Sequence, residues 1–523
     1  MNIPTERLIR ELSRPEAFPE TTRDIRVVQT HISVIFITEN RVYKVKKPVD
    51  FGFLDFTTPE KRLRFCTEEV ELNRRLSPDL YLGVLPVTEE GDLLRFGGSG
   101  PALDYAVLMN RLQEDRLLPI LLEKHEVTPE MIERVAAKVA RFHLQAATSP
   151  EITRIGGSDA IHTNTEENFE QIQPYIGHTL SQATFDLLAD FTRTFRDVNR
   201  ELFLRRESEG WIRDGHGDLH TQHICLTGDI QIYDCIEFNR RFRYSDVLCD
   251  AAFLAMDLRM KGRKDLADLY TRKYLEFTGQ GGTEALYNFY ACYRAVVRGK
   301  VEGFRSRDPD VNEKEAQRAA EDARGFFHLA GELARAITPP GLIITCGLMG
   351  SGKSSLAAGL AEKFDLEVIS TDRVRKELAG MDPLESKHVP YGGDIYSSEF
   401  TDRTYRELSA RSEALLKSGA SVILDGTFLN PGYRSLATET ARKTGSHCIF
   451  IYLNADEQLL RSRLRQRLQE TSVSDGREEI LADQIKAAIP PDEISKDRKL
   501  DIDARLSGEK IVTTAYRRLL STS

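Results

Sequence analysis

A glycine-rich loop that ends in a lysine and a serine is the part of the chain best suited to bind phosphate. Residues 347–354 fit the spacing G-x-x-x-x-G-K-[ST]; an apolar run at 342–346 predicts a buried strand before them, and residues 354–361 predict a helix after them. Backbone N–H groups and the positive end of the helix bind phosphates in such a loop, and a chance glycine turn would not explain all three features. Lys353 is expected to reach the β- and γ-phosphates, and Ser354 to ligate Mg²⁺. The predicted nucleotide-binding residues are Gly347, Leu348, Met349, Gly350, Ser351, Gly352, Lys353 and Ser354.

A second group of residues has the side chains that phosphoryl transfer requires. Asp218 lies in His-Gly-Asp-Leu-His (216–220), and Asp234 follows it in Gln-Ile-Tyr-Asp-Cys-Ile-Glu (231–237). Transfer to a hydroxyl needs one carboxylate to orient the hydroxyl and accept its proton, and a second carboxylate on Mg²⁺. We therefore expect Asp218 to act on the acceptor and Asp234 to bind the metal.

The same reaction needs a cation on the nucleotide phosphates, held in place by an acid. Lys44, in Val-Tyr-Lys-Val-Lys (42–46), is the first choice, and Lys46 is the second because strand side chains alternate with period two. Glu69 is the expected ion-pair partner, with Glu68 and Glu71 close by on the same predicted helix. The alternative is that both lysines lie on a solvated edge strand.

These motifs resemble those of the aminoglycoside phosphotransferase family, whose catalytic loop reads H-G-D-x-x-x-x-N and whose metal-binding aspartate ends a following hairpin. The resemblance covers residues 25–330 approximately. It implies a bilobal, protein-kinase-like α+β domain, with a small β-rich lobe before a larger helical lobe. Residues 244–253 resemble the segment that supports the catalytic loop, so Asp250 either accepts hydrogen bonds from the loop backbone or caps a helix.

One position departs from the family pattern. The family has Asn five residues after the catalytic Asp, as the second metal ligand, and this chain has His223 there. Imidazole nitrogen is a poor ligand for Mg²⁺, which prefers oxygen. His223 remains the predicted second metal ligand, in a site that works with one fully protein-held metal, is weakened, or has another use. Two alternatives are a zinc cluster of His216, His220 and His223, which requires the segment to be helical, and histidines with a purely structural role.

The second half of the chain contains further residues that suit a kinase. Asp372 and Arg375 follow the predicted strand 366–369, and ligands of open α/β sheets bind beyond the carboxyl ends of strands. Asp372 is expected to accept the proton of a substrate hydroxyl, and Arg375 to hold an anionic group or the transferring phosphate. This D-x-x-R resembles polynucleotide 5′-hydroxyl kinases and related small-molecule kinases. The alternative is a helix-capping Asp and a surface Arg.

Two further features complete this predicted site. Asp425 ends an apolar strand and suits the acid that assists Mg²⁺ binding. Arg463 and Arg467 fit the R-L-x-x-R pattern that precedes a lid in the same class of kinases, where lid arginines neutralise charge on the transferring phosphate. A basic, solvated helix face is the alternative for each arginine. Residues 474–476 resemble the lid, and the segment from Gln484 to the Pro490-Pro491 pair resembles its return helix.

The elements that must position these residues fall into two domains. The prolines of Thr338-Pro339-Pro340 break regular structure, so the predicted domains are residues 1–337 and 338–523. In the first, strands at 32–38 and 41–46 are joined by a hairpin at Glu39-Asn40, followed by a helix at 63–76 and a strand at 105–109. In the second, strands at 342–346, 366–369, 421–424 and 448–453 alternate with helices, which predicts an α/β fold with a parallel sheet.

The bulk composition is that of a globular protein with more than one domain. The chain has 523 residues, 41% apolar content, 29% charged content and a net charge of −9. This charge does not favour nucleic acid or anionic lipid as a partner. Seven scattered cysteines, no apolar leader and no long apolar run predict a reduced, cytoplasmic protein without a membrane span.

The chain as a whole resembles a bacterial family in which an aminoglycoside phosphotransferase-like domain is fused to a P-loop, AAA-type, polynucleotide-kinase-like domain. We expect an ATP- and Mg²⁺-dependent kinase with two nucleotide-phosphate sites, acting on hydroxyls of small molecules or, less favoured by charge, of nucleic-acid ends. No membrane and no obligate protein partner are expected. The alternative function is an ATP-driven switch with an N-terminal pseudokinase module, and His223 is the residue that favours it.

Overall fold

The computed structural model describes residues 3–52, 54–91, 93–382, 394–467 and 478–522. The chain divides into two compact units. Unit 1 comprises Met1–Phe185 and Glu201–Ala330, and unit 2 comprises Asp186–Arg200 and Gly331–Ser523. Within the described residues, no helix combines the length and apolar character needed to cross a membrane.

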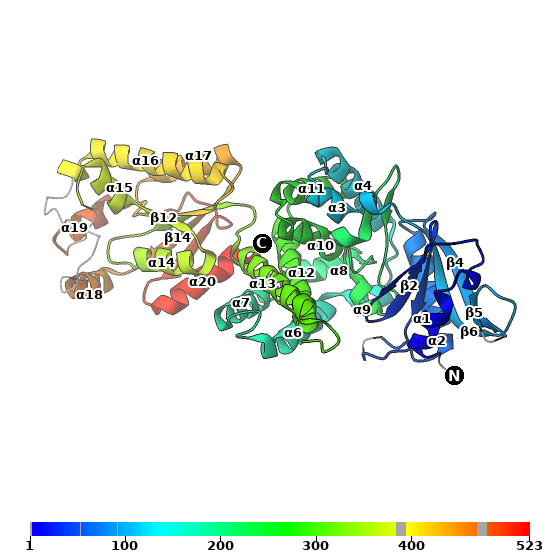
Figure 1. Ribbon diagram of the computed structural model, residues 1–523. Helices are drawn as coiled ribbons and strands as arrows, with labels where there is room; N and C mark the ends of the chain where they lie inside the picture. The colour runs from blue at the N-terminus through cyan, green and yellow to red at the C-terminus, as the bar shows by residue number, and fades with distance from the viewer. Residues whose placement is uncertain (1–2, 53, 92, 383–393, 468–477, 523) are drawn as a thin grey trace. The chain divides into compact units, whose positions relative to one another are not determined.

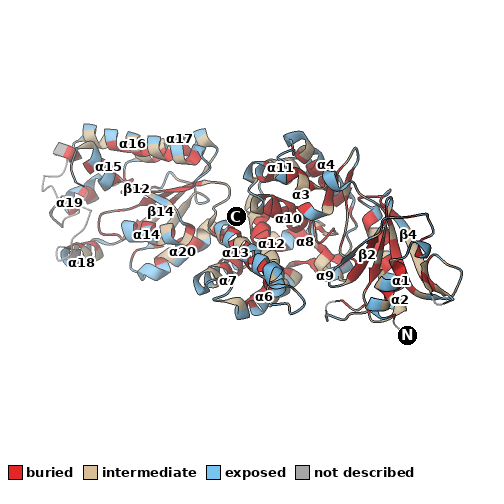
Figure 2. Ribbon diagram, viewed as in Figure 1, coloured by how far each residue is buried: buried red, intermediate tan, exposed pale blue. Residues whose placement is uncertain are grey.

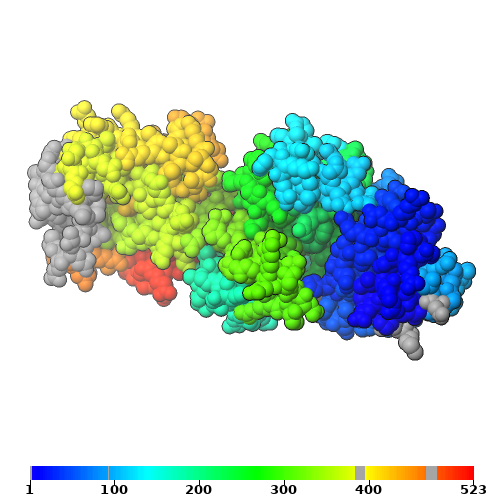
Figure 3. Space-filling model, in the orientation of Figure 1, coloured from blue at the N-terminus to red at the C-terminus, as the bar shows by residue number. Residues whose placement is uncertain are grey.

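Unit 1 begins with a β-rich lobe. Its antiparallel sheet has the strand order β1-β2-β3-β6-β4-β5. Helix α1 (Thr5–Leu12) packs on one face through Leu8 and Leu12, and α2 (Pro59–Arg74) packs on the other through Cys66 and Val70. Figure 3 shows the dark blue N-terminal residues covering the face of this lobe that is turned to the viewer. The strands are β1 (Arg26–Gln29), β2 (Ser33–Ile37), β3 (Arg41–Lys46), β4 (Tyr81–Glu90), β5 (Leu93–Phe96) and β6 (Ala102–Asn110).

This lobe places the predicted lysines inside a sheet. The β2–β3 hairpin turns at Glu39-Asn40, as the sequence predicts. Strand β3 lies between β2 and β6, so the alternative of a solvated edge strand is wrong for Lys44 and Lys46. The sequence did not reveal β1, β4 or β5. Strands β1 and β5 are only four residues long, and β4 contains Gly83 and Pro86, which do not favour a strand.

The rest of unit 1 is helical, with two short β-ribbons that carry the catalytic segment. Helix α10 is buried from Val247 to Leu258, as expected of a helix at the centre of a lobe. The ribbons pair β7 (Ile212–Asp214) with β10 (Tyr244–Asp246), and β8 (Ile224–Leu226) with β9 (Ile230–Ile232). The helices are α3 (Leu118–Glu123), α4 (Pro129–Gln145), α5 (Pro150–Gly156), α6 (Ser158–Ile172), α7 (Gln182–Val198), α8 (Arg200–Ser208), α9 (Arg240–Arg243), α10 (Val247–Met260), α11 (Lys264–Thr278), α12 (Glu284–Arg305) and α13 (Glu313–Arg335).

Unit 2 is a parallel five-stranded sheet with the order β12-β13-β11-β14-β15. Helices α14 and α20 cover one face and α16 and α17 the other, and the strands between them are mostly buried (Figures 1 and 2). The strands are β11 (Gly341–Cys346), β12 (Glu367–Ser370), β13 (Val422–Asp425), β14 (His447–Asn454) and β15 (Lys499–Asp503). The helices are α14 (Lys353–Phe364), α15 (Thr371–Leu378), α16 (Ser398–Lys417), α17 (Pro431–Thr444), α18 (Glu457–Arg467), α19 (Glu478–Ala487) and α20 (Gly508–Leu520).

Unit 2 also contains a segment from the first half of the chain. Residues 186–200, which include most of α7, pack with the P-loop unit. Buried Asn199 donates to the Leu520 carbonyl at 2.9 Å and accepts from the Thr522 amide at 2.8 Å, and Lys363 of α14 forms an ion pair with Asp190 at 2.8 Å. The four strands predicted from sequence are present within a residue of their predicted ends. The fifth, β15, was missed because Lys-Leu-Asp-Ile-Asp lacks an apolar run.

Candidate active sites

A buried carboxylate holds the catalytic loop of unit 1. Asp250, on α10, accepts hydrogen bonds from the His216 amide at 2.6 Å and the Gly217 amide at 2.9 Å. Asp246, not Asp250, caps α10 by accepting from Leu248 N. Gly217 has φ 86°, and a Cβ there would lie 2.9 Å from the carbonyl oxygen of Phe242, so only glycine fits this turn. Of the two roles expected for Asp250, the support of the loop backbone is the one that the structure contains.

His216 braces the loop through both ring nitrogens. Its Nδ1 accepts from the Asp218 amide at 3.2 Å, so Nε2 carries the proton and donates to the Tyr233 carbonyl at 3.0 Å. Burial lowers the pKa of His216 to about 4, which keeps the ring neutral. The zinc cluster that included His216 is therefore wrong, because neither nitrogen is available to a metal and the loop is not an α-helix.

The other two histidines face the two catalytic carboxylates. His220 Nδ1 accepts from the Gln222 amide at 3.4 Å, which leaves Nε2–H directed at Asp218 Oδ2, 3.4 Å away. His223 Nδ1 donates to the Asp218 carbonyl at 2.8 Å, and its Nε2 lies 3.5 Å from Asp234 Oδ2. The sequence singled out His220 only as a possible zinc ligand; its contact with Asp218 depends on a single 3₁₀ turn, η4 (Thr221–His223), that no sequence pattern reveals.

Both carboxylates are anionic in this environment. Burial acts to raise the pKa of Asp218, but the facing His220, which directs its Nε2–H at the carboxylate, brings that pKa below the ordinary value. For Asp234, burial is likewise outweighed, chiefly by the Lys44 ammonium, so its pKa is lowered. Asp234 has φ 62°, a left-handed conformation that Asp tolerates better than most residues. The backbone thus turns sharply at the residue predicted to bind the metal.

The predicted lysine–glutamate pair is present, and it is part of a larger network. Lys44 Nζ lies 2.9 Å from Glu69 Oε1 and 2.7 Å from Asp234 Oδ1. Lys46 Nζ lies 2.6 Å from Glu69 Oε2 and also pairs with Glu237. Lys46 is fully buried, whereas Lys44 keeps some exposure, so Lys44 is the lysine accessible to a ligand. The sequence offered Lys46 only as a substitute for Lys44 and missed Glu237 altogether.

The donor atoms in this site suit a divalent cation. Asp218, His220 and His223 each place a possible ligand atom within 4.8 Å of the others, and the Asp234 carboxylate faces His223. Because His220 Nε2 carries a proton toward Asp218, the available donors are the two carboxylates and His223 Nε2. Carboxylate oxygen suits Mg²⁺, and imidazole suits transition ions.

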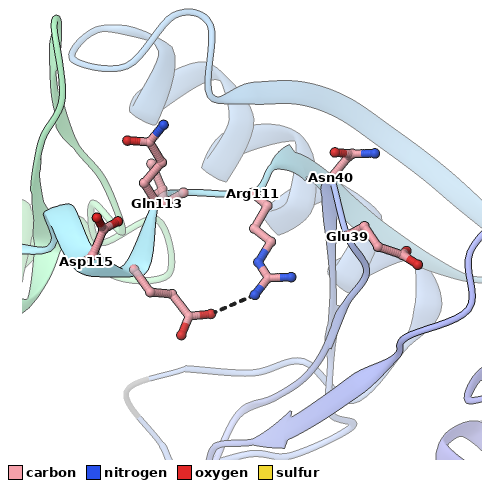
Figure 4. A pocket seen from close by; sticks show the side chains of 7 residues that line it. Glu39, Asn40, Arg111, Gln113 and Asp115 are labelled. Atoms are coloured by element: carbon pink, nitrogen blue, oxygen red, sulfur yellow. Dashed lines mark hydrogen bonds and ion pairs between the residues drawn. The ribbon is translucent and has the colours of Figure 1, made fainter.

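A cavity of about 420 Å³ lies where β6 leads into the helical lobe of the same unit (Figure 4). Its lining is polar, and Arg111 and Glu114 form an ion pair across it at 3.1 Å. The Arg111 amide also donates to the Asn40 carbonyl at 2.9 Å, which ties this connection to the β2–β3 hairpin. None of the predicted catalytic residues lines this cavity.

The phosphate loop of unit 2 leads from β11 into α14, as its sequence predicts. Lys353 Nζ donates to the Leu348 carbonyl at 2.8 Å, and the Gly347 amide donates to Thr427 at 3.0 Å. A Cβ at Gly347 would lie 2.7 Å from the carbonyl oxygen of Leu453, so the loop passes too close to β14 for any other residue. Asp425, at the end of β13, accepts from Thr345 Oγ1 at 3.1 Å, which places its carboxylate beside the strand that enters the loop.

Helices α18 and α19 contact the phosphate loop. Arg463 donates to the Ser351 carbonyl at 3.1 Å and to Ala504 at 2.7 Å, so it fixes the loop backbone. Gln484 accepts from the Met349 amide at 2.8 Å, a contact that the sequence did not predict. Arg461 pairs with Glu457 on its own helix. The side chain of Arg467 and the predicted lid residues 474–476 lie outside the described residues.

Asp372 and Arg375 lie on the first turns of α15, directly after β12. Ser370 is the N-cap residue of this helix, so the capping role considered for Asp372 is wrong. Arg375 is only 7% exposed, so it is not a surface residue either. Its guanidinium lies 4.5 Å from the centre of the Tyr396 ring, and its Nε has no hydrogen-bond partner among the described residues.

Comparisons with known proteins agree with this two-part arrangement. A model described as "Phosphotransferase enzyme family" matches residues 38–287, and a model described as "AAA domain" matches residues 342–491. The uncharacterized protein Rv2004c of Mycobacterium tuberculosis and the uncharacterized protein Mb2027c of Mycobacterium bovis are each 33% identical to the chain. Each alignment covers 86% of this chain and 88% of the relative. The chain belongs to their family.

In this family a phosphotransferase domain of the aminoglycoside phosphotransferase type is joined to a P-loop kinase-like domain, so the resemblance stated from sequence is confirmed. Three solved structures overlap parts of this family member. Aminoglycoside 2′-phosphotransferase-IIIa covers 61% of the chain and 97% of its own, at 14% identity and a TM-score of 0.35. A choline/ethanolamine kinase family protein from Mesorhizobium loti covers 63% of the chain and 98% of its own, at 11% identity and a TM-score of 0.38. A gluconokinase from Sinorhizobium meliloti covers 35% of the chain and 92% of its own, at 22% identity and a TM-score of 0.26.

Proposed function

We propose that the protein is an ATP-dependent kinase with two phosphotransferase sites, each of which transfers phosphate to a hydroxyl group of a small molecule. The observation that carries this proposal is the constellation in unit 1, where Asp218, Asp234 and the Lys44–Glu69 pair meet around one loop. The two family matches support ATP-dependent phosphotransferase activity; the presence of two working sites and the kind of acceptor are what we add.

In unit 1, Asp218 orients the acceptor hydroxyl and takes its proton. The lowered pKa of Asp218 keeps it anionic and available as an acceptor, and the Nε2–H of His220 fixes the carboxylate. Lys44 holds the α- and β-phosphates while Glu69 holds Lys44. Val42 shares the face of Lys44 and, with Leu112 and Tyr233, offers apolar surface for the base of a nucleotide.

In unit 2, the phosphate loop binds the nucleotide and α15 binds the acceptor. Lys353 exchanges its bond to Leu348 for the β- and γ-phosphates, and Ser354 with Asp425 holds the metal. Asp372 takes the proton of the acceptor hydroxyl, and Arg375 holds an anionic group or the transferring phosphate. Mg²⁺, when bound at either site, neutralises charge on the phosphates.

The composition of the chain bears on the class of acceptor and on the cellular location of the protein. A net charge of −9 favours a small molecule over a nucleic-acid end, although the latter fits the D-x-x-R pattern. We place the protein in the cytoplasm, without a membrane or an obligate protein partner, on the same composition. Fold alone does not decide the acceptor, since one fold serves many substrates.

A second candidate function is an ATP-driven switch whose unit 1 is a pseudokinase. Two observations favour it: His223 replaces the Asn of the family pattern, and Lys44 is bonded to Asp234. The test uses the full chain with γ-labelled ATP and a mixture of hydroxylated metabolites. Two active sites predict that Asp218→Asn and Asp372→Asn each remove a different labelled product. If Asp218→Asn removes none while Asp372→Asn does, unit 1 is a pseudokinase.

A further inference from the structure

The imidazole of His223 is aimed at the metal-binding carboxylate by a contact on its opposite side. Its Nδ1 donates to the Asp218 carbonyl at 2.8 Å, so the neutral ring presents the lone pair of Nε2. That nitrogen lies 3.5 Å from Asp234 Oδ2, in a ring that is 13% exposed. A backbone carbonyl that fixes the tautomer of a histidine is the usual outer partner of a metal-binding imidazole.

Two acceptors face each other in this contact. A carboxylate has no proton to donate, and Nε2 of this tautomer accepts as well, so the pair gains no hydrogen bond from its proximity. A cation between them would satisfy both. The neighbouring His220 does not fill this role, because its Nε2–H is directed at Asp218.

We propose that His223, through Nε2, and Asp234, through a carboxylate oxygen, bind a divalent transition-metal ion such as Mn²⁺. This inference rests on the proposed function of unit 1 as a nucleotide site. Mg²⁺ demands oxygen ligands, which the Asn of the family pattern supplies and an imidazole does not. Mn²⁺ accepts carboxylate and phosphate oxygen, and transition ions accept imidazole nitrogen. A closed structural zinc site would need more side-chain nitrogen or sulfur than this single available imidazole provides.

The test measures the metal directly, in the full chain. The variants Ser354→Ala and Asp425→Asn are introduced together to remove the metal ligands predicted in unit 2. Free Mn²⁺ is titrated by electron paramagnetic resonance, and the bound ion is examined by spin-echo modulation for coupling to ¹⁴N. His223→Asn restores the oxygen donor of the family pattern. His125→Asn is the control, because His125 lies at φ 57°, which Asn tolerates, and belongs to neither site.

We expect nitrogen coupling in the parent protein and in His125→Asn, and its loss in His223→Asn. The Mn²⁺ affinity should fall by on the order of ten-fold or more in His223→Asn. Mutating even a residue that only hydrogen-bonds a metal ligand typically lowers metal affinity by that factor, and His223 is a direct ligand in this proposal. The preference for Mn²⁺ over Mg²⁺, measured by competition, should shrink in the same variant. Bound Mn²⁺ without nitrogen coupling in the parent would overturn the inference whether or not the variant folds.

The same samples separate this inference from the kinase proposal. Labelled transfer that depends on Asp218, together with Mn²⁺ that shows no nitrogen coupling, would refute the metal assignment and leave the kinase standing. Nitrogen-coupled Mn²⁺ in a unit that binds no ATP would support the metal assignment and refute the kinase. Equal affinities for Mn²⁺ and Mg²⁺ in the parent would also refute the metal assignment.

Discussion

Nζ of Lys44 lies 2.7 Å from Oδ1 of Asp234, so the lysine predicted to hold the nucleotide is bonded to the carboxylate predicted to hold its metal. Burial acts to lower the pKa of Lys44, but Asp234 and Glu69 outweigh it and raise that pKa, so the lysine is charged. Without a ligand, each group neutralises the other. Nucleotide binding must therefore replace this bond with bonds to phosphate and metal, while Glu69 keeps its hold on Lys44.

The two lysines of β3 should differ in what their loss costs. Lys44→Met should abolish transfer by unit 1, since no other cation accessible to a ligand occupies that place among the described residues. Lys46→Met should instead destabilise unit 1 by about 3–5 kcal/mol, because it leaves Glu237 buried without its partner. Urea unfolding followed by the fluorescence of Trp211, the single tryptophan of the chain, measures the stability of this unit. A stable Lys46→Met variant that has lost only activity would reverse the roles of the two lysines.

Lys353→Ala should remove ATP turnover by unit 2, because Lys353 is the lysine of the phosphate loop itself and its Nζ lies inside the loop, 2.8 Å from the Leu348 carbonyl. The matched control is Lys363→Ala, on the same helix, whose lysine forms an exposed ion pair with Asp190. That pair is worth at most about 1 kcal/mol, so activity should survive its loss. Nucleotide affinity by calorimetry and the Asp372-dependent product check both variants. An unchanged affinity and turnover in Lys353→Ala would contradict the assignment of this loop.

Asp372→Asn should reduce transfer by unit 2 about 10²–10⁴-fold, the usual contribution of a general base, while ATP affinity survives. Asp365→Asn is the control. Asp365 directly follows the C-terminal end of α14, away from the phosphate loop, and its φ of 53° is well tolerated by Asn. Single-turnover transfer and ATP titration are measured on the same preparations. Loss of ATP affinity together with activity would make Asp372 part of the nucleotide site instead.

Unit 1 should lose stability in mild acid because of His216. Its pKa is about 4 in the folded protein and near the ordinary 6.5 when unfolded, so below pH 6.5 the unfolded chain binds the extra proton. The free energy of unfolding is unaffected by this group above pH 6.5. As the pH falls from 6.5 to 4, it decreases by about 3 kcal/mol. His223, whose pKa burial also lowers, adds to the same slope.

The slope is measured as the free energy of unfolding by urea between pH 4.5 and 7.5, with Trp211 fluorescence as the signal. His216→Gln, which does not titrate, should have a shallower dependence on pH than the parent, whatever its absolute stability. Parallel curves for the two proteins would mean that His216 is not the group responsible.

The contact of Asn199 with the chain end should stabilise unit 2. Asn199→Ala removes the donor to Leu520 and the acceptor for Thr522, which should cost roughly 1–3 kcal/mol for the buried groups left without partners. The thermal transition that ATP raises in the parent but not in Lys353→Ala belongs to this unit, since Lys353 lies at the phosphate loop. If Asn199→Ala melts at the temperature of the parent, the contacts of Asn199 with the chain end contribute nothing to the stability of the unit.

The sequence by itself determined the local chemistry of both sites. The phosphate loop is continuous in the chain, and its flanking strand and helix follow from short-range apolar patterns, so residues 347–354 could be predicted together with β11 and α14. The H-G-D loop and the D-x-x-R segment were found for the same reason. Lys44 and Glu69 were paired because phosphoryl transfer needs a cation held by an acid, and the structure contains that pair.

Only the tertiary structure decided the relationships between distant residues. Three of these contacts join residues more than a hundred positions apart: Lys46 pairs with Glu237, Lys44 with Asp234, and Gln484 accepts from the phosphate loop. The backbone also turns sharply at Asp234. The tautomers of the three histidines likewise depend on which backbone groups surround each ring. Apolar periodicity specifies which face of an element is buried, but it does not specify which polar groups the packed elements bring together.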